Sequence, residues 1–226
     1  MADSIITKVN SYWDDKYDDD NDDEGYCDCD DPRPSRRDAA AQPPKVLWTA
    51  CADSPFPKSV DPHPATGNVF VYRNMANQFR ADDSSALAVL EHAVHTLKVY
   101  HVVVEGYTDC ACIQASIEAA HTARAAHTDP AAPTTPLARW LAPLTVLAAG
   151  FPPPDSLRKR ALLLVEQGVA VQVAGVVRAL GALQPLDRPV HVHGLVYDLE
   201  QRELDLDVSV TVGGGGDEAG AAGAAA

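Results

Sequence analysis

Two cysteines stand where two strand-like segments end. Cys51 directly follows the apolar run Lys45–Ala50, and Cys110 comes shortly after the β-branched run Tyr100–Glu105. Adjacent parallel strands end at one edge of their sheet, where ligands bind, so both thiols are expected there. Thiolates are zinc ligands and nucleophiles. Two side chains with acid–base chemistry accompany them, Asp53 and Tyr107. The sequence therefore predicts a metal or catalytic site at this edge.

The elements that must position these residues alternate along the chain. Apolar and β-branched runs predict five strands, over Lys45–Ala50, Asn68–Tyr72, Tyr100–Glu105, Val190–Leu199 and Glu203–Val210. Apolar periodicity or Ala-rich composition predicts four helical segments, over Ser84–Val99, Cys112–Ala126, Leu137–Ala149 and Asp155–Leu183, the last broken or bent near Gly168 and Gly175. This alternation predicts an α/β fold with a mainly parallel central β-sheet flanked by helices.

Charge and composition divide the chain into three parts. The formal net charge is -14, but residues 14–31 alone hold eleven Asp or Glu against one Lys. Such a segment buries too little apolar surface to offset the entropy of ordering. We expect residues 1–41 to form an arm with a disordered acidic segment, residues 42–212 to form one domain, and residues 213–226 to form a flexible Gly/Ala-rich tail.

The same composition excludes several classes of protein. An acidic balance argues against nucleic-acid binding, which needs a basic surface. No apolar run approaches the roughly 18 residues of a membrane span, and the first residues do not resemble a signal peptide. We therefore expect a cytoplasmic protein with no nucleic-acid or membrane partner, in which the five cysteines stay reduced.

Several ordered motifs resemble the β-class carbonic anhydrases, and the resemblance covers most of the domain. Cys51-Ala52-Asp53-Ser54 is similar to the family's Cys-x-Asp-Ser motif. The segment from Gly67 to Asn77 is similar to Gly-Asp-x-Phe-x-x-Arg-Asn-x-Ala-Asn, and Gly106 to Cys110 stands where the family has Gly-His-x-x-Cys. The segment from Val192 to Asp198 resembles the family's closing strand.

The resemblance implies a zinc lyase that interconverts carbon dioxide and bicarbonate. Cys51 and Cys110 match the two thiolate ligands, and Asp53 matches a carboxylate that an arginine holds away from the metal. A histidine completes the family's ligand set, and a water occupies the fourth position. Gln42 matches a pocket glutamine that hydrogen-bonds substrate. The resemblance also implies a homodimer or a higher oligomer.

The sequence departs from this pattern at the metal. Tyr107 replaces the histidine, Pro55 replaces the arginine, and Ala111 and Cys112 replace two glycines of the pocket. A phenol must lose a proton with a pKa near 10 before it binds zinc well. Without a cationic partner Asp53 can swing onto the metal and close a Cys51, Cys110 and Asp53 set. We therefore expect less than one equivalent of tightly bound zinc, and weak or absent hydration of carbon dioxide.

Alternatives remain for several residues. Cys112 is expected to face the core, although its spacing from Cys110 also suits a replacement ligand. Tyr107 either packs over a vacant pocket or serves, with Asp53 and a thiol nucleophile, a lyase or hydratase reaction on another small substrate. A third hypothesis is a non-catalytic protein that pairs with partners. His191 and His193 are expected to share one face of a strand, and a metal role for them is the less favoured interpretation.

Overall fold

The protein is represented by a computed structural model, which describes residues 44–54, 69–130, 135–151, 156–198 and 203–213. The expectations for the N-terminal arm and the C-terminal tail, and those for Gln42 and Pro55, fall outside these residues and stay predictions.

A five-stranded sheet carries the domain, in the order β2-β1-β3-β4-β5. Its strands are β1 (Val46–Cys51), β2 (Val69–Asn74), β3 (His101–Tyr107), β4 (Val190–Asp198) and β5 (Glu203–Val212). All neighbouring pairs are parallel except β4 and β5, which pair antiparallel. β1 and β3 are buried along nearly their whole length, as their unbroken apolar runs indicate. The predicted mainly parallel sheet flanked by helices is confirmed.

The helices follow the strands in the predicted order. They are α3 (Ser84–Glu91), continued by the π-helical turn η2 (His92–Thr96), then α4 (Ala111–Ala126), α5 (Pro136–Gly150) and α6 (Leu157–Ala182). The Asp83 side chain caps α3 by accepting from the backbone N–H groups of Ser85 and Ala86. The first helical segment ends before Val99, where the sequence placed its end, because Lys98 adopts a left-handed conformation with φ of 59°.

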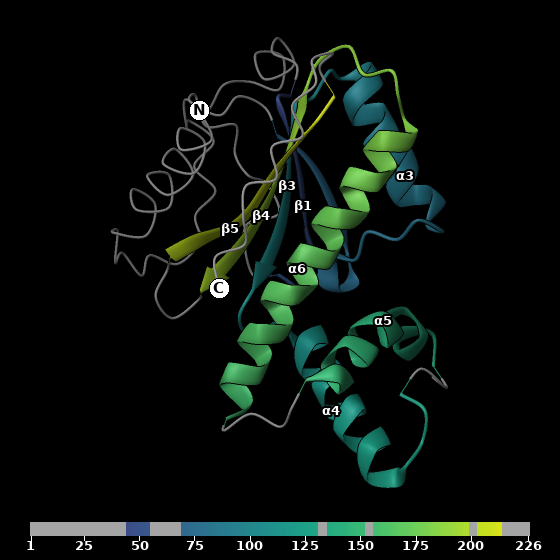
Figure 1. The fold of residues 1–226 in the computed structure, drawn as a ribbon, viewed down its shortest axis with the longest axis vertical. Coiled ribbons are helices and arrows are strands. Elements are labelled where there is room, and N and C mark those ends of the chain that lie inside the picture. Colours follow the sequence, from purple (N-terminus) through teal and green to yellow (C-terminus); the bar gives the residue numbers. More distant parts are fainter. Residues whose placement is uncertain (1–43, 55–68, 131–134, 152–155, 199–202, 214–226) are drawn as a thin grey trace, which may run out of the picture.

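α6 runs along one face of the sheet, over β3, β4 and β5, while α4 and α5 pack together at one end of the molecule (Figure 1). The sequence predicted a break or a bend near Gly168 and Gly175, and the break is wrong, because α6 is one continuous helix. Gly175 instead permits close packing, since a Cβ there would lie 3.1 Å from the carbonyl oxygen of Phe79. By length and composition α6 alone among the described helices could span a membrane, but its sheet contacts are those of a core helix.

The packing of α6 on the sheet depends on glycines in the strands beneath it. A Cβ added to Gly106 of β3 would lie 2.7 Å from Val169 Cγ2 and 2.8 Å from Val165 Cγ1. We expect Gly106→Ala to lower the free energy of unfolding by about 1–3 kcal/mol, because two β-branched side chains must move. Gly181→Ala, at an α6 position with open space around it, should instead raise it slightly. Urea titration of both variants measures the contrast, and equal effects would contradict this packing.

Candidate functional site

The structure places Cys51 and Cys110 at the same edge of the sheet, as the sequence predicted. Cys51 is the last residue of β1, and Cys110 is the residue that immediately precedes α4, just beyond the end of the neighbouring strand β3. The two Sγ atoms lie 3.9 Å apart, and both thiols are buried. The crossover between these strands therefore brings together two thiols that lie 59 residues apart in the chain.

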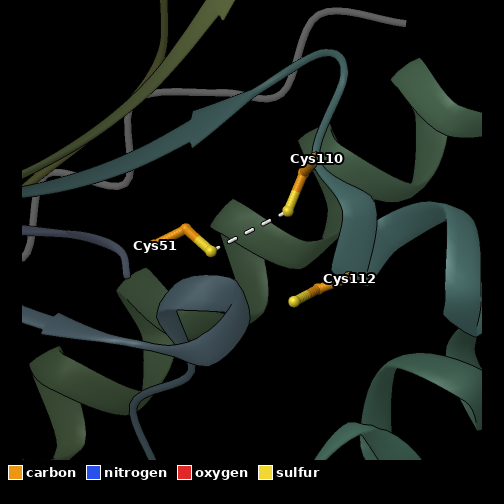
Figure 2. A group of neighbouring side chains, drawn as sticks. All are labelled: Cys51, Cys110 and Cys112. Carbon is orange, nitrogen blue, oxygen red and sulfur yellow. Dashed lines mark hydrogen bonds between the residues drawn. The ribbon is translucent and has the colours of Figure 1, made fainter. Parts of the chain in front are cut away.

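A third thiol joins them. Cys112 lies in the first turn of α4, is buried, and points toward the other two (Figure 2). The three Sγ atoms lie within 4.8 Å of one another, and this is the one such group of three or more metal-ligating side chains within the described ranges. Cys112 is therefore buried in the core, as the sequence favoured, and it also belongs to this thiol cluster, as the alternative allowed. The Cys110-x-Cys112 spacing at a helix start was the signal for it.

Backbone donors hold the Cys51 sulfur. The turn η1 (Met75–Asn77) follows β2, and the N–H of Ala76 donates to Cys51 Sγ at 3.1 Å. Asp53 donates its backbone N–H to the same sulfur at 3.4 Å. Ala76 has a φ of 61° and Asn77 a φ of 45°, so η1 adopts a left-handed backbone that costs free energy unless its surroundings hold it.

Side-chain hydrogen bonds keep η1 in this backbone conformation. Asn77 Nδ2 donates to the carbonyl oxygens of Thr49 at 2.9 Å and Glu105 at 2.8 Å, and so ties the ends of β1 and β3 together. Trp140 of α5 donates from Nε1 to the carbonyl oxygen of Met75 at 2.7 Å. The Ala76 N–H is therefore fixed in place by both the sheet and a helix, which pre-organises the position of Cys51.

The thiols share protons. Hydrogen bonds with Cys110 and then Cys112, together with the backbone donors, lower the pKa of Cys51 well below its usual range. The hydrogen bond with Cys112 lowers the pKa of Cys110, but the hydrogen bond with Cys51 and burial outweigh it, so this pKa is raised. Hydrogen bonds with Cys110 and Cys51, followed by burial, raise the pKa of Cys112. The hydrogen bonds within the cluster therefore favour ionisation of Cys51 over that of Cys110 and Cys112, and a metal ion would displace the thiol protons.

Tyr107 lies beside this cluster at the end of β3 and is 3% exposed. Burial raises the pKa of its hydroxyl above the usual range, and the charge of Cys110 and a hydrogen bond with that thiol add to the effect. The phenol therefore stays protonated near neutral pH. In that state it donates a hydrogen bond and is a poor metal ligand and a poor general base.

The space in front of the thiols is small. A cavity of about 30 Å³ is lined by polar and sulfur-bearing groups, among them Cys51, Asn77, Tyr107, Cys110 and Gln172, and by apolar side chains of α5 and α6. Because one ordered water needs roughly 10–15 Å³ by this measure, the cavity has room for about two. Any ligand that enters it without rearrangement has very few heavy atoms.

The structure does not gather all of the sequence-predicted residues at the thiols. Asp53 is exposed in the turn after β1, and its carboxylate is outside the group of close ligand atoms. Its backbone, in contrast, contacts Cys51. Gln42 and Pro55 lie outside the described residues. Within the described residues the third position beside Cys51 and Cys110 is therefore filled by a sulfur.

Glu105 is a buried acid that the motifs did not single out. Its side chain is 4% exposed, and Trp48 donates from Nε1 to its Oε2 atom. Burial raises the pKa of Glu105 to about 7, although the Trp48 hydrogen bond and the charge of Arg73 oppose the shift. The sequence pattern of β3 predicts only that position 105 is buried. The hydrogen-bond donor that stabilises a buried carboxyl there is Trp48 of the paired strand β1, which the pattern of β3 does not reveal.

This buried acid makes stability depend on pH. A carboxyl whose folded pKa of about 7 exceeds its unfolded value of 4.5 binds more protons when folded, so stability falls as pH rises through that interval. Glu105→Gln keeps an acceptor for Trp48 and removes the titration. Between about pH 4.5 and pH 8, we expect the unfolding free energy of the variant to rise relative to wild type by about 3 kcal/mol, at 1.36 kcal/mol per pKa unit. Urea titrations check this, with the exposed Glu118→Gln as the control for replacing one glutamate by glutamine.

The donor set of the thiol cluster fits a zinc ion. Ligand sulfurs at about 2.3 Å from a tetrahedral zinc lie about 3.8 Å from one another. The separation of Cys51 and Cys110 is 3.9 Å, and Cys112 lies within 4.8 Å of both. The Ala76 N–H on Cys51 is an outer-shell partner of the kind that orients ligands.

Comparisons with known proteins agree on one family. A model of the family described as carbonic anhydrase matches residues 46–204. A carbonic anhydrase of Emericella nidulans is 39% identical over 87 residues, which are 38% of this chain and 38% of that protein. The chain thus aligns with about two fifths of that relative's length.

Solved structures extend the likeness to most of the chain. The β-carbonic anhydrase CafA of Aspergillus fumigatus superposes with a TM-score of 0.57 at 26% identity, covering 91% of this chain and 90% of that one. A tetrameric β-carbonic anhydrase of Sordaria macrospora superposes with a TM-score of 0.58 at 23% identity, covering 78% of this chain and 87% of that one. At 23% identity, the likeness to the Sordaria macrospora protein shows a shared fold and nothing further.

Proposed function

The chain belongs to the β-carbonic anhydrase family, and we propose that it is a zinc protein of that family with a sulfur-rich site and a low rate of carbon dioxide hydration. Cys51, Cys110 and Cys112 hold the metal. The observation that carries this proposal is the third thiol, which lies within 4.8 Å of the two family ligands.

The residues around the site favour binding over rapid turnover. A zinc ion with an open coordination position lowers the pKa of a bound water to about 7 and so supplies a nucleophile. Three thiolates surround the site with more negative charge than two thiolates and an imidazole do, which opposes that ionisation. The Tyr107 hydroxyl supports Cys110 by hydrogen bonding and, being protonated, does not take up a proton. The cavity admits a molecule as small as carbon dioxide.

The third thiol changes the expectation for metal content. With two cysteines and a phenol the sequence predicted less than one equivalent of tightly bound zinc, whereas three pre-organised sulfurs support one full equivalent. Elemental analysis of the purified full chain, combined with stopped-flow hydration assays, tests the proposal. We expect at least one zinc per chain and a rate far below that of an intact relative assayed alongside. A metal-free protein, or a rate equal to that of the relative, would contradict it.

The proposal extends to assembly. The Sordaria macrospora relatives are described as tetrameric, and a homo-oligomer of this chain is consistent with the shared fold. Sedimentation velocity of the full chain measures the oligomer, and we expect a dimer or tetramer rather than a monomer. A monomer at micromolar concentration would remove this part of the proposal and leave the zinc site untouched.

A further inference from the structure

Three histidines meet on one face of the sheet, at the opposite end of β3 from the thiols. His101 begins β3 and pairs across with His191 of β4, while His193 lies two residues further along β4. The ring centroid of His101 lies 5.1 Å from that of His191 and 5.3 Å from that of His193. The six-residue length of strand between His101 and Tyr107 spans about 20 Å, so this cluster is separate from the zinc site.

Hydroxyl groups of β5 orient two of these rings. His193 Nδ1 lies 3.1 Å from Ser209 Oγ, and His191 Nδ1 lies 2.9 Å from Thr211 Oγ1, in both cases from residues paired across the β4–β5 ladder. When the hydroxyl oxygen accepts the Nδ1 proton, Nε2 carries the lone pair, and in His193 that Nε2 faces Nδ1 of His101. Metal-binding histidines use this outer-shell arrangement, in which one ring nitrogen donates and the other ligates.

The remaining nitrogen atoms have the spacing of a ligand pair. His101 Nδ1 and His193 Nε2 are hydrogen-bonded at 3.0 Å. This is close to the separation of about 3.3 Å for two imidazole nitrogens at 2.0–2.1 Å from one tetrahedral ion, so a metal ion could replace the proton that the two rings share. His193 is 3% exposed and His101 is half-buried.

We propose that His101, His191 and His193 form a second transition-metal site, independent of the thiol cluster and suited to ions that favour imidazole, such as Zn²⁺, Co²⁺ and Ni²⁺. His101 and His193 supply the close pair. The ring of His191 stacks on that of His101 at an interplanar angle of 29°. The nitrogens of the three rings are not all within the 4.8 Å of one another that the three thiols satisfy, so His191 must turn about its side-chain torsions to present Nε2 as the third ligand. This inference does not depend on the proposed hydratase chemistry.

Cobalt titration of the metal-free full chain tests the proposal, because the two sites absorb differently. Co²⁺ bound by thiolates gives sulfur-to-metal charge-transfer bands in the near ultraviolet, whereas Co²⁺ bound by imidazoles gives only weaker visible bands. We expect two equivalents, one of each kind. His193→Gln and His101→Gln should each weaken the imidazole equivalent by more than about 100-fold, beyond the 10–100-fold typical of outer-shell changes, and leave the thiolate bands unchanged.

Controls make every outcome informative. His121→Gln changes an exposed histidine of α4 and should retain both equivalents. His101 is only half-buried, so His101→Gln carries the test if His193→Gln fails to fold by circular dichroism. A wild-type protein that binds only the thiolate equivalent, or variants that retain the second one, would overturn the proposal. Loss of the thiolate equivalent alone would contradict the proposed zinc site and leave this one standing.

Discussion

Replacing Cys112 by serine should weaken zinc binding by more than about 100-fold, as much as replacing Cys51 or Cys110. Loss of an outer-shell partner alone costs roughly 10–100-fold, so loss of a ligand exceeds it. A serine hydroxyl stays protonated and cannot replace a thiolate. This prediction differs from the pattern that the family resemblance implies, which has a glycine at this position. It also goes beyond the sequence, from which Cys112 was expected to face the core.

Competition with a chromophoric chelator measures this affinity for the wild type and each variant. The double variant Cys27→Ser, Cys29→Ser is the matched control, because those thiols belong to the acidic segment, and zinc affinity should be unchanged. Cys112→Ala tests whether the small buried side chain matters for folding rather than for the metal. If Cys112→Ser bound zinc within a few-fold of the wild type, Cys112 would be a core residue and the three-sulfur site would be wrong.

Substitutions at Tyr107 and Cys112 should change the rate of carbon dioxide hydration. Tyr107→His alone adds a fourth strong ligand to three sulfurs, which closes the coordination sphere, so we expect tighter zinc and no gain in hydration. Tyr107→His combined with Cys112→Ala gives two thiolates and an imidazole, with one position open. For this double variant we expect the hydration rate to rise on the order of 100-fold, because the donor set then carries one negative charge less.

Stopped-flow hydration assays of the two variants distinguish this account from a simple loss of histidine. If Tyr107→His alone restored the rate, Cys112 would not occupy the third position. Pro55→Arg added to the double variant should raise the rate further, since an arginine would keep Asp53 from the open position, as the family resemblance implies. The same arginine added to the wild type should change little.

Much of the fold follows from local patterns in the sequence. The sequence predicted β1 and β3 from their apolar runs, because both strands are buried in the core. It predicted α3 from its helical periodicity, because one face of that helix packs against the core. The continuity of α6 could not be predicted from Gly168 and Gly175. A glycine signals flexibility in isolation, but here Gly175 is required by the backbone of Phe79 across the interface.

The site was predictable in its location and only partly in its composition. The strand ends placed Cys51 and Cys110 at one edge, since the geometry of parallel strands fixes that edge. The direction of the Cys112 side chain depends on where α4 begins, and a shift of one residue would turn it away. The raised pKa values of Tyr107 and Glu105 depend on burial by residues distant in sequence, which no local pattern reveals.

Zinc X-ray absorption spectroscopy of the purified full chain tests the central claim most directly, because sulfur and lighter ligands scatter differently at 2.3 Å and 2.0 Å. Loaded with a single equivalent, the wild type should show three sulfur ligands and one light ligand, and Cys112→Ser should show two sulfur ligands. A wild-type spectrum with two sulfurs that does not change in Cys112→Ser would contradict the three-thiol site.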